Sequence, residues 1–205
     1  MEGIIINFKE LVQVSYQEIP RDTIIFTKKT RLWCQLSYPN RPNGCPNYGK
    51  NKLCHPFAPY LEKDAYFNSF EHYYLIIAQF DFKKYKDLRR IKHPNWSEAQ
   101  LGNKIHWQKT IKLFLKREIK RLSLTYGLNT SFLLGCGSGF ILNEKKCYSL
   151  EAVGIYVYKT LDLNHIEYEQ KPKDQIKLIC LLAANRPFNH SYKNTLDKFM
   201  GGNLS

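Results

Sequence analysis

Three cysteines fall within one irregular stretch of the chain, where they could act together as metal ligands. Cys34, Cys45 and Cys54 lie in the segment CQLSYPNRPNGCPNYGKNKLC, which is rich in proline and glycine. Thiolates are the ligands that proteins use for zinc and for iron–sulfur clusters. Residues 35–59 are predicted to be loop, and so long an irregular run inside a compact domain needs something to organise it. We therefore expect these three thiols to converge on one metal centre.

The spacing of the cysteines leaves the metal and the fourth ligand open. It is wider than the paired cysteines of a zinc ribbon or the compact ferredoxin run, although Cys45-Pro46 resembles the Cys-Pro step of iron–sulfur ligand runs. Cys136 or Cys147 could complete a closed structural site. Otherwise the fourth position is open to water or substrate. The alternative is that the three loop thiols are unrelated. Cys180 lies in an apolar run and is expected in the core.

Several motifs of this chain are similar to those of a known family. They are Cys45-Pro-Asn-Tyr-Gly-Lys50, Cys54-His-Pro56 followed by Pro59-Tyr60, and the run from Ser149 to Val157, SLEAVGIYV. Together they resemble the family of predicted metal-binding proteins catalogued as domain of unknown function 2284, over roughly residues 25–185. The resemblance also includes the YYLIIAQF strand and Glu118 in a basic helix. It implies that the chain binds a metal.

The chain departs from the family pattern in its second cysteine-rich stretch. That stretch resembles a ferredoxin-type motif in the family, but here it retains only Cys136 and Cys147. The usual proline after the third loop cysteine is His55, and the usual aspartate after Gly-Ile is Tyr156. The resemblance therefore implies a divergent member that kept one metal site and lost another.

The chain is strongly basic, which favours a polyanionic partner. It has 31 Lys and Arg against 18 Asp and Glu, a formal net charge of +13. RNA is the partner that we expect first, with assembly into a larger protein complex as the alternative and a merely solvated lysine surface as the default. The candidate contacts are Lys83, Lys84, Lys86, Arg89, Arg90, Lys92, Lys109, Lys112, Lys116 and Lys120.

The pattern of elements predicts one layered α/β domain over residues 1–184 and a polar tail over 185–205. We expect a mixed sheet with strands within 22–34, 72–80, 131–136 and 176–183, together with helices within 60–71 and 151–165. Residues 83–96 are expected to be irregular. A long basic helix should run from a cap at Ser97 to Gly127. Its apolar positions, Ile105, Ile111, Leu115, Ile119 and Leu122, should face the sheet, leaving Lys109, Lys112, Lys116 and Lys120 in solvent.

No membrane-length apolar run and no signal-peptide pattern is visible, so we expect a cytoplasmic protein with reduced thiols. Two functional hypotheses follow, and the sequence does not decide whether the protein is an enzyme. The first is an iron–sulfur protein, or less readily a zinc protein, working in redox or sulfur chemistry. The second is a non-enzymatic module or structural subunit whose metal only stabilises the fold.

Overall fold

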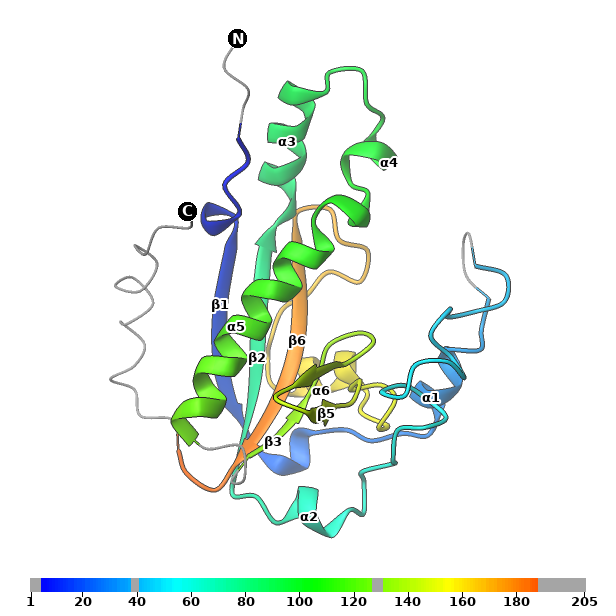
Figure 1. Ribbon diagram of the computed structural model, residues 1–205, viewed down its shortest axis with the longest axis vertical. Coiled ribbons are helices and arrows are strands. Elements are labelled where there is room, and N and C mark those ends of the chain that lie inside the picture. The colour runs from blue at the N-terminus through cyan, green and yellow to red at the C-terminus, as the bar shows by residue number, and fades with distance from the viewer. Residues whose placement is uncertain (1–4, 38–40, 127–130, 188–205) are drawn as a thin grey trace.

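A four-stranded antiparallel sheet forms the centre of the molecule. The computed structural model describes residues 5–37, 41–126 and 131–187. The sheet has the order β1-β2-β6-β3 (Figure 1), and each of its three strand pairs is antiparallel. The strands are β1 (Val12–Ile19), β2 (His72–Asp81), β6 (Gln175–Ala184) and β3 (Ser131–Leu134).

The expectation of a mixed sheet is wrong for the described strands, while three of the four predicted strand regions are confirmed. The added strand, β1, was not expected. It alternates apolar and polar side chains, as suits an edge strand with one face toward the core. Its pairing with β2 runs from Val12 opposite Phe80 to Ile19 opposite Tyr73.

Helix α5 (Gln108–Tyr126) covers one face of this sheet. Ile111, Leu115, Ile119 and Leu122 are all buried in the same core cluster as Tyr74 and Ile76 of β2, which confirms the predicted apolar face. Lys109 and Lys120 are exposed as expected. Lys112 and Lys116, by contrast, are half-buried.

The predicted long helix is interrupted near its start. Ser97 does cap a helix, and its backbone N–H donates in return to Gln100 Oε1, but α4 (Glu98–Leu101) stops at Gly102. A short 3-10 turn (Lys104–His106), capped by Asn103, separates it from α5. Ile105 lies in this turn and is 76% exposed, so its assignment to the buried face is wrong. The predicted end at Gly127 lies outside the described residues.

Helix α3 (Phe82–Lys92) replaces the irregular segment expected over 83–96. Asp81 caps it by accepting a hydrogen bond from the backbone N–H of Lys84, and Phe82 and Tyr85 are buried at its start. Its remaining turns are rich in Lys and Arg, which are good helix formers, and Leu88 packs partly buried against the same core.

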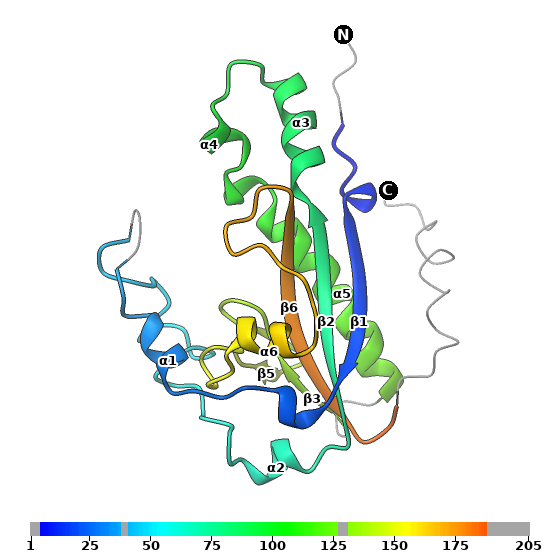
Figure 2. The same cartoon turned by 180° about the vertical axis from the view of Figure 1, so that it is seen from behind.

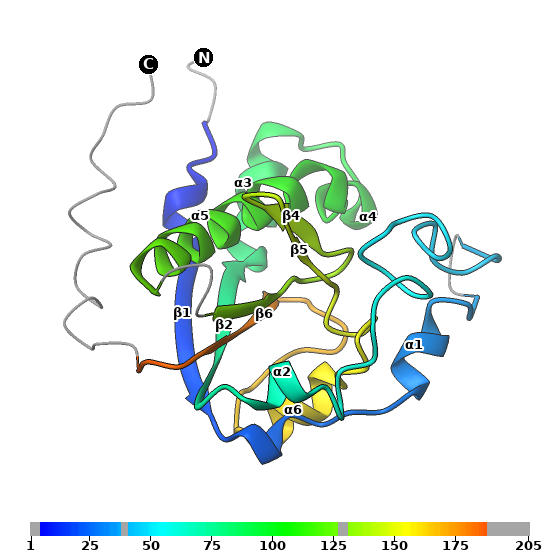
Figure 3. The same cartoon turned by 60° about the horizontal axis from the view of Figure 1, so that its bottom comes forward.

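The opposite face of the sheet is covered by short elements and coil (Figures 2 and 3). These include α2 (Ala65–Asn68), α6 (Val157–Leu163) and a 3-10 turn at Arg21–Thr23. Helix α1 (Lys29–Trp33) lies to the side of the sheet (Figure 2), and the 3-10 turn at Phe8–Glu10 packs through Phe8 against the core on the α5 side. A strand was expected where α1 lies, and only Phe26 there forms a β-bridge, with Ile155. Helices α2 and α6 fall within predicted regions. A hairpin of β4 (Phe140–Leu142) and β5 (Lys145–Cys147) was not expected.

Among the described helices, none combines the length and the apolar character needed to cross a lipid bilayer. The predicted polar tail, 185–205, lies outside the described residues after residue 187.

Candidate metal centre

A backbone hydrogen bond holds Cys34 and Cys45 next to each other. Cys34 caps the C-terminus of α1, and the backbone N–H of Cys45 donates to the carbonyl of Cys34 at 2.7 Å. The pKa of Cys34 is raised to about 11, first by burial and then by the negative charges that Cys45, Cys54 and Glu151 can carry.

Cys54 belongs to the same electrostatic group. Burial raises its pKa, the neighbouring Cys45 and Glu151 raise it further, and Lys112 opposes them. The Cys54 Sγ lies 3.7 Å from the carbonyl oxygen of Ser138, to which it donates. The three thiols are widely and unevenly spaced in the sequence. In the fold they nevertheless lie close enough for the charge of one to shift the pKa of another.

The Cys54 end of the loop is anchored to the turn and segment that follow β3. Asn51 donates to the carbonyl of Ser138 at 3.1 Å, and the backbone N–H of Ser149 donates to the carbonyl of Leu53 at 3.0 Å. Leu53 itself is buried. These bonds fix where Cys54 lies, although the described residues 35–37 and 41–59 contain no helix or strand.

Glu151 is the acidic member of this group, and sequence reasoning missed it. Its carboxylate accepts a hydrogen bond from Ser149 Oγ at 2.9 Å, and its carbonyl accepts one from Thr30 Oγ1 at 3.0 Å. Burial raises the pKa of its carboxyl group. The available signal was a single carboxylate inside the otherwise apolar run SLEAVGIYV.

The other cysteines form a second group around Cys136. Cys136 hydrogen-bonds with Cys180, which lowers the pKa of Cys136, and Lys112 lowers it further against the effect of burial. Burial raises the pKa of Cys147 to about 11. Cys180 is fully buried, as expected, but it has a thiol partner that the sequence did not indicate. The roles of Cys136 and Cys147 as ligands stay predictions.

The thiols are suitable ligands for a metal, but they are not arranged as a complete coordination shell. Across residues 5–37, 41–126 and 131–187, no group of three or more His, Cys, Asp and Glu side chains is arranged so that it could hold an ion. The donor set of three thiols beside one carboxylate does fit a thiophilic metal such as iron or zinc. We conclude that Cys34, Cys45 and Cys54 are electrostatic neighbours, and their ligand role stays a prediction.

His55 is engaged elsewhere. Arg31 contacts its Nδ1 through Nε at 3.2 Å and Nη2 at 3.0 Å, and also donates to the carbonyl of Ala58. Burial and the positive charge of Arg31 lower the pKa of His55. The ring is thus part of the scaffold that holds α1 against the loop.

The predicted basic contacts divide into exposed and engaged side chains. Lys83, Lys84 and Lys92 are exposed on α3. Arg90 forms ion pairs with Asp87 and Glu98, and Lys86 lies 3.7 Å from Glu98.

Two other residues of the set lie against aromatic rings. Arg89 packs over Trp96 at 4.5 Å, and Lys116 lies 5.1 Å from the ring centroid of Phe140. Trp96 in turn stacks on His93 at 4.0 Å, so it is not the open stacking platform that a base would need.

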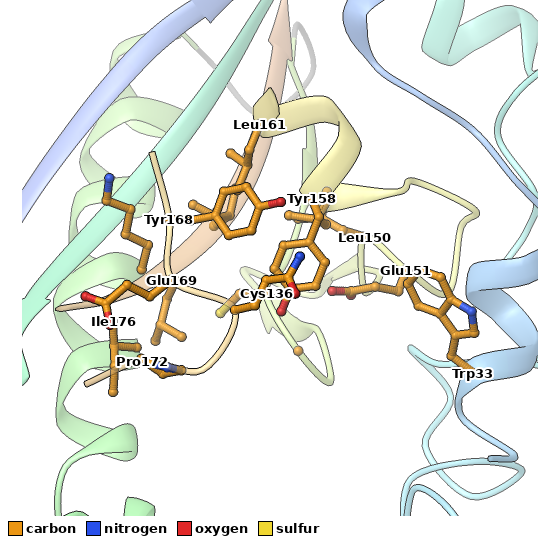
Figure 4. A pocket seen from close by; sticks show the side chains of 16 residues that line it. Trp33, Cys136, Leu150, Glu151, Tyr158, Leu161, Tyr168, Glu169, Pro172 and Ile176 are labelled. Carbon is orange, nitrogen blue, oxygen red and sulfur yellow. The ribbon is translucent and has the colours of Figure 1, made fainter. Parts of the chain in front are cut away.

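A cavity of about 460 Å³ is bordered by Cys136 and Glu151 (Figure 4). Trp33 and Glu151 contribute to one part of its wall, Tyr158 and Tyr168 to another, and Cys136 also lines it. Apolar side chains of α6 and β6, such as Leu161, Ile176 and Ile179, complete the lining. The cavity thus brings Glu151 of the first group and Cys136 of the second to one space.

Comparison with known proteins gives one match. A family model described as Predicted metal-binding protein (DUF2284) matches residues 17–183. No curated protein and no solved structure matches the chain.

Proposed function

The chain belongs to the DUF2284 family of predicted metal-binding proteins, and from this premise we propose that the thiolates of Cys34, Cys45 and Cys54 hold its metal. The observation that carries the proposal is the mutual effect of these thiols. Cys45 and Cys54 both raise the pKa of Cys34, and Cys45 raises that of Cys54. A region where anions disfavour one another is a region that a cation stabilises.

An iron–sulfur cluster is the metal group that we propose first, with zinc as the alternative. A cluster would supply redox or sulfur chemistry, whereas zinc closed by a fourth thiol would only stabilise the fold. The residues of the chain would then have distinct tasks. Asn51 and Leu53 fix the Cys54 end of the loop, and Glu151 adds negative charge beside the thiols.

Because the thiols are neighbours without a finished shell, we propose that metal binding also orders the loop. Binding energy spent on bringing the ligands together appears as added stability of the loaded protein. The loaded protein should therefore melt at a higher temperature than the protein stripped by a chelator. It should also resist proteolysis between residues 41 and 55.

The test is metal analysis of protein purified without oxygen. Iron, acid-labile sulfide and zinc are measured per chain for the wild type and for Cys34→Ala, Cys45→Ala and Cys54→Ala, with Cys180→Ala as the matched control. We expect each loop substitution to abolish stoichiometric metal and the control to retain it. Equal metal content in all five proteins would refute the assignment. Iron with sulfide, or zinc alone, decides between the two metal groups.

A second candidate function is polyanion binding, favoured by the exposure of Lys83, Lys84 and Lys92 on one helix. Each phosphate contact releases counterions, so binding to single-stranded RNA should weaken with salt by a log–log slope of roughly −0.7 per contact. Reversing these three charges to Glu should abolish that slope. The matched control reverses three exposed lysines elsewhere, Lys63, Lys171 and Lys173. Equal effects of the two triple variants would leave only non-specific attraction.

A further inference from the structure

The cavity beside the thiols has the size and lining of a small-molecule site. Its volume of about 460 Å³ lies within the range of about 300–1,000 Å³ that is usual for ligand pockets. Apolar side chains make up most of its wall, and a few polar groups converge on it. Nothing in the family's metal-binding description assigns a ligand to this space.

Aromatic rings give the cavity two flat surfaces. Tyr158 stacks on Tyr168 with ring centroids 4.9 Å apart and an interplanar angle of 26°. Trp33 packs edge-on against Tyr156 at 5.1 Å, on the side where Glu151 lies. Trp33 and Tyr158 are 38% and 43% exposed, which is high for rings that line a pocket. Such surfaces favour a planar aromatic ligand.

The charged side chains that line the cavity differ in whether they can bind a ligand. Glu169 accepts hydrogen bonds from the backbone N–H groups of Lys173, Asp174 and Gln175, so it is committed to closing that turn. Lys177 donates to the carbonyl of Glu167. Glu151 is held by Ser149, and its carboxylate points toward Cys136 and Tyr158 in Figure 4. It is the charged group that can meet a ligand.

The electrostatics at Glu151 select the ligand group. The thiols of Cys34 and Cys54 lie close enough to sense its charge. Lys177 is the cationic residue of the lining and is bonded to Glu167, while Lys112 lines a separate cavity of about 130 Å³ that also contacts Cys136. A buried carboxyl group accepts hydrogen bonds from cationic or strongly polar N–H groups, and a cation beside it offsets the burial that raises its pKa.

We propose that this cavity binds a planar aromatic molecule bearing an amino or amidino group, with its ring against Tyr158 and Trp33 and its nitrogen at Glu151. The cavity is lined by residues of the chain itself, and of the six cysteines only Cys136 is among them. It adds a ligand class to the protein, whichever metal is found.

Three benzimidazoles of the same shape test the proposal with the full-length protein. One carries an amino group, one a methyl group and one a carboxylate at the same ring position. Isothermal titration should show the amino compound binding about tenfold or more tightly than the methyl compound, as expected for a charge-assisted hydrogen bond. The carboxylate compound should bind more weakly still. Equal binding of the amino and methyl compounds, tightest binding of the carboxylate, or no binding at all would overturn the proposal.

Two substitutions separate the two halves of the site. Glu151→Gln should reduce affinity for the amino compound about tenfold or more and weaken the methyl compound less, because the methyl compound keeps only the ring N–H as a donor. Tyr158→Leu should weaken both compounds equally, because it removes the ring contact. Glu71→Gln, an exposed carboxylate outside the cavity, is the matched control and should have no effect. An effect of Glu71→Gln as large as that of Glu151→Gln would show general charge attraction instead of a site. The comparison of the three compounds on the wild type stands even if a variant fails to fold.

Discussion

Replacing Gly44 by alanine is the sharpest test of the way the loop holds Cys34 beside Cys45. Gly44 has φ of +75°, and a β-carbon added there would lie 2.5 Å from the carbonyl oxygen of Cys34. Gly49, on the same loop, has φ of +66° with no atom within 4 Å of such a β-carbon. The two positions therefore share the backbone strain and differ only in the close approach.

The expected magnitudes follow from these two terms. A left-handed backbone costs an alanine about 1–2 kcal/mol, which applies to both variants. At Gly44 the overlap must also be relieved, by separating the two cysteines that share the 2.7 Å backbone bond. Overpacking of this kind costs about 1–3 kcal/mol, and the lost hydrogen bond about 1 kcal/mol. Gly44→Ala should then cost about 3 kcal/mol or more, and Gly49→Ala about 1–2 kcal/mol.

The assay is competition for metal against a chelating dye, on protein stripped and reloaded without oxygen. Because the loop must adopt its structure when it binds metal, these costs appear as lost affinity. Gly44→Ala should weaken binding by about a hundredfold or more and Gly49→Ala by about tenfold. Circular dichroism of the metal-free proteins checks that the sheet is intact in both. Equal weakening by the two variants would refute the close approach, and wild-type affinity of Gly44→Ala would refute the loop as the metal site.

Other substitutions test the scaffold and the surface. Leu115→Ala should lower the free energy of unfolding by about 2–5 kcal/mol in urea denaturation, since it opens a cavity between α5 and the sheet; a loss below about 1 kcal/mol would contradict that packing. Glu118→Ala should cost about 1.5–3 kcal/mol, because the buried carboxylate accepts from Arg121 Nε at 3.0 Å; the reading fails if high salt abolishes the difference. Reversing only Lys83 and Lys84 to Glu should reduce the salt slope of RNA binding by about 1.4, two contacts at roughly 0.7 each. An unchanged slope would direct attention to a protein partner.

The strands and the apolar face of α5 could be predicted because their buried apolar side chains leave a recognisable pattern in the sequence. Residues 72–80 and 176–183 are mostly apolar, and both strands lie in the middle of the sheet. The helix α3 could not be found by the same signal, since only Phe82 and Tyr85 are buried in it. Its cap at Asp81 was a local signal that would have indicated a start. Strand β1 carried the alternation of a half-buried strand.

The candidate site was predictable in its residue types and not in its partners. The clustering of Cys34, Cys45 and Cys54 along the chain indicated where to look. The contribution of Glu151 depends on a fold that returns the chain to α1, and no local pattern encodes that return. The contact between Cys136 and Cys180 likewise depends on the pairing of β3 with β6. The family resemblance indicated that the chain binds a metal, and the residue types in the sequence indicated which side chains could be its ligands.

Two hydrogen bonds near the cysteines join segments of the chain that the ribosome delivers at different times. Thr30 bonds to Glu151, 121 residues further along the chain, and Ser149 N–H bonds to Leu53. A ribosome adding about 5–20 residues per second needs on the order of ten seconds to deliver those partners. During that interval the three cysteines have left the ribosome without the segment that shields them. The nascent chain is then open to whatever supplies its metal, and equally to oxidants.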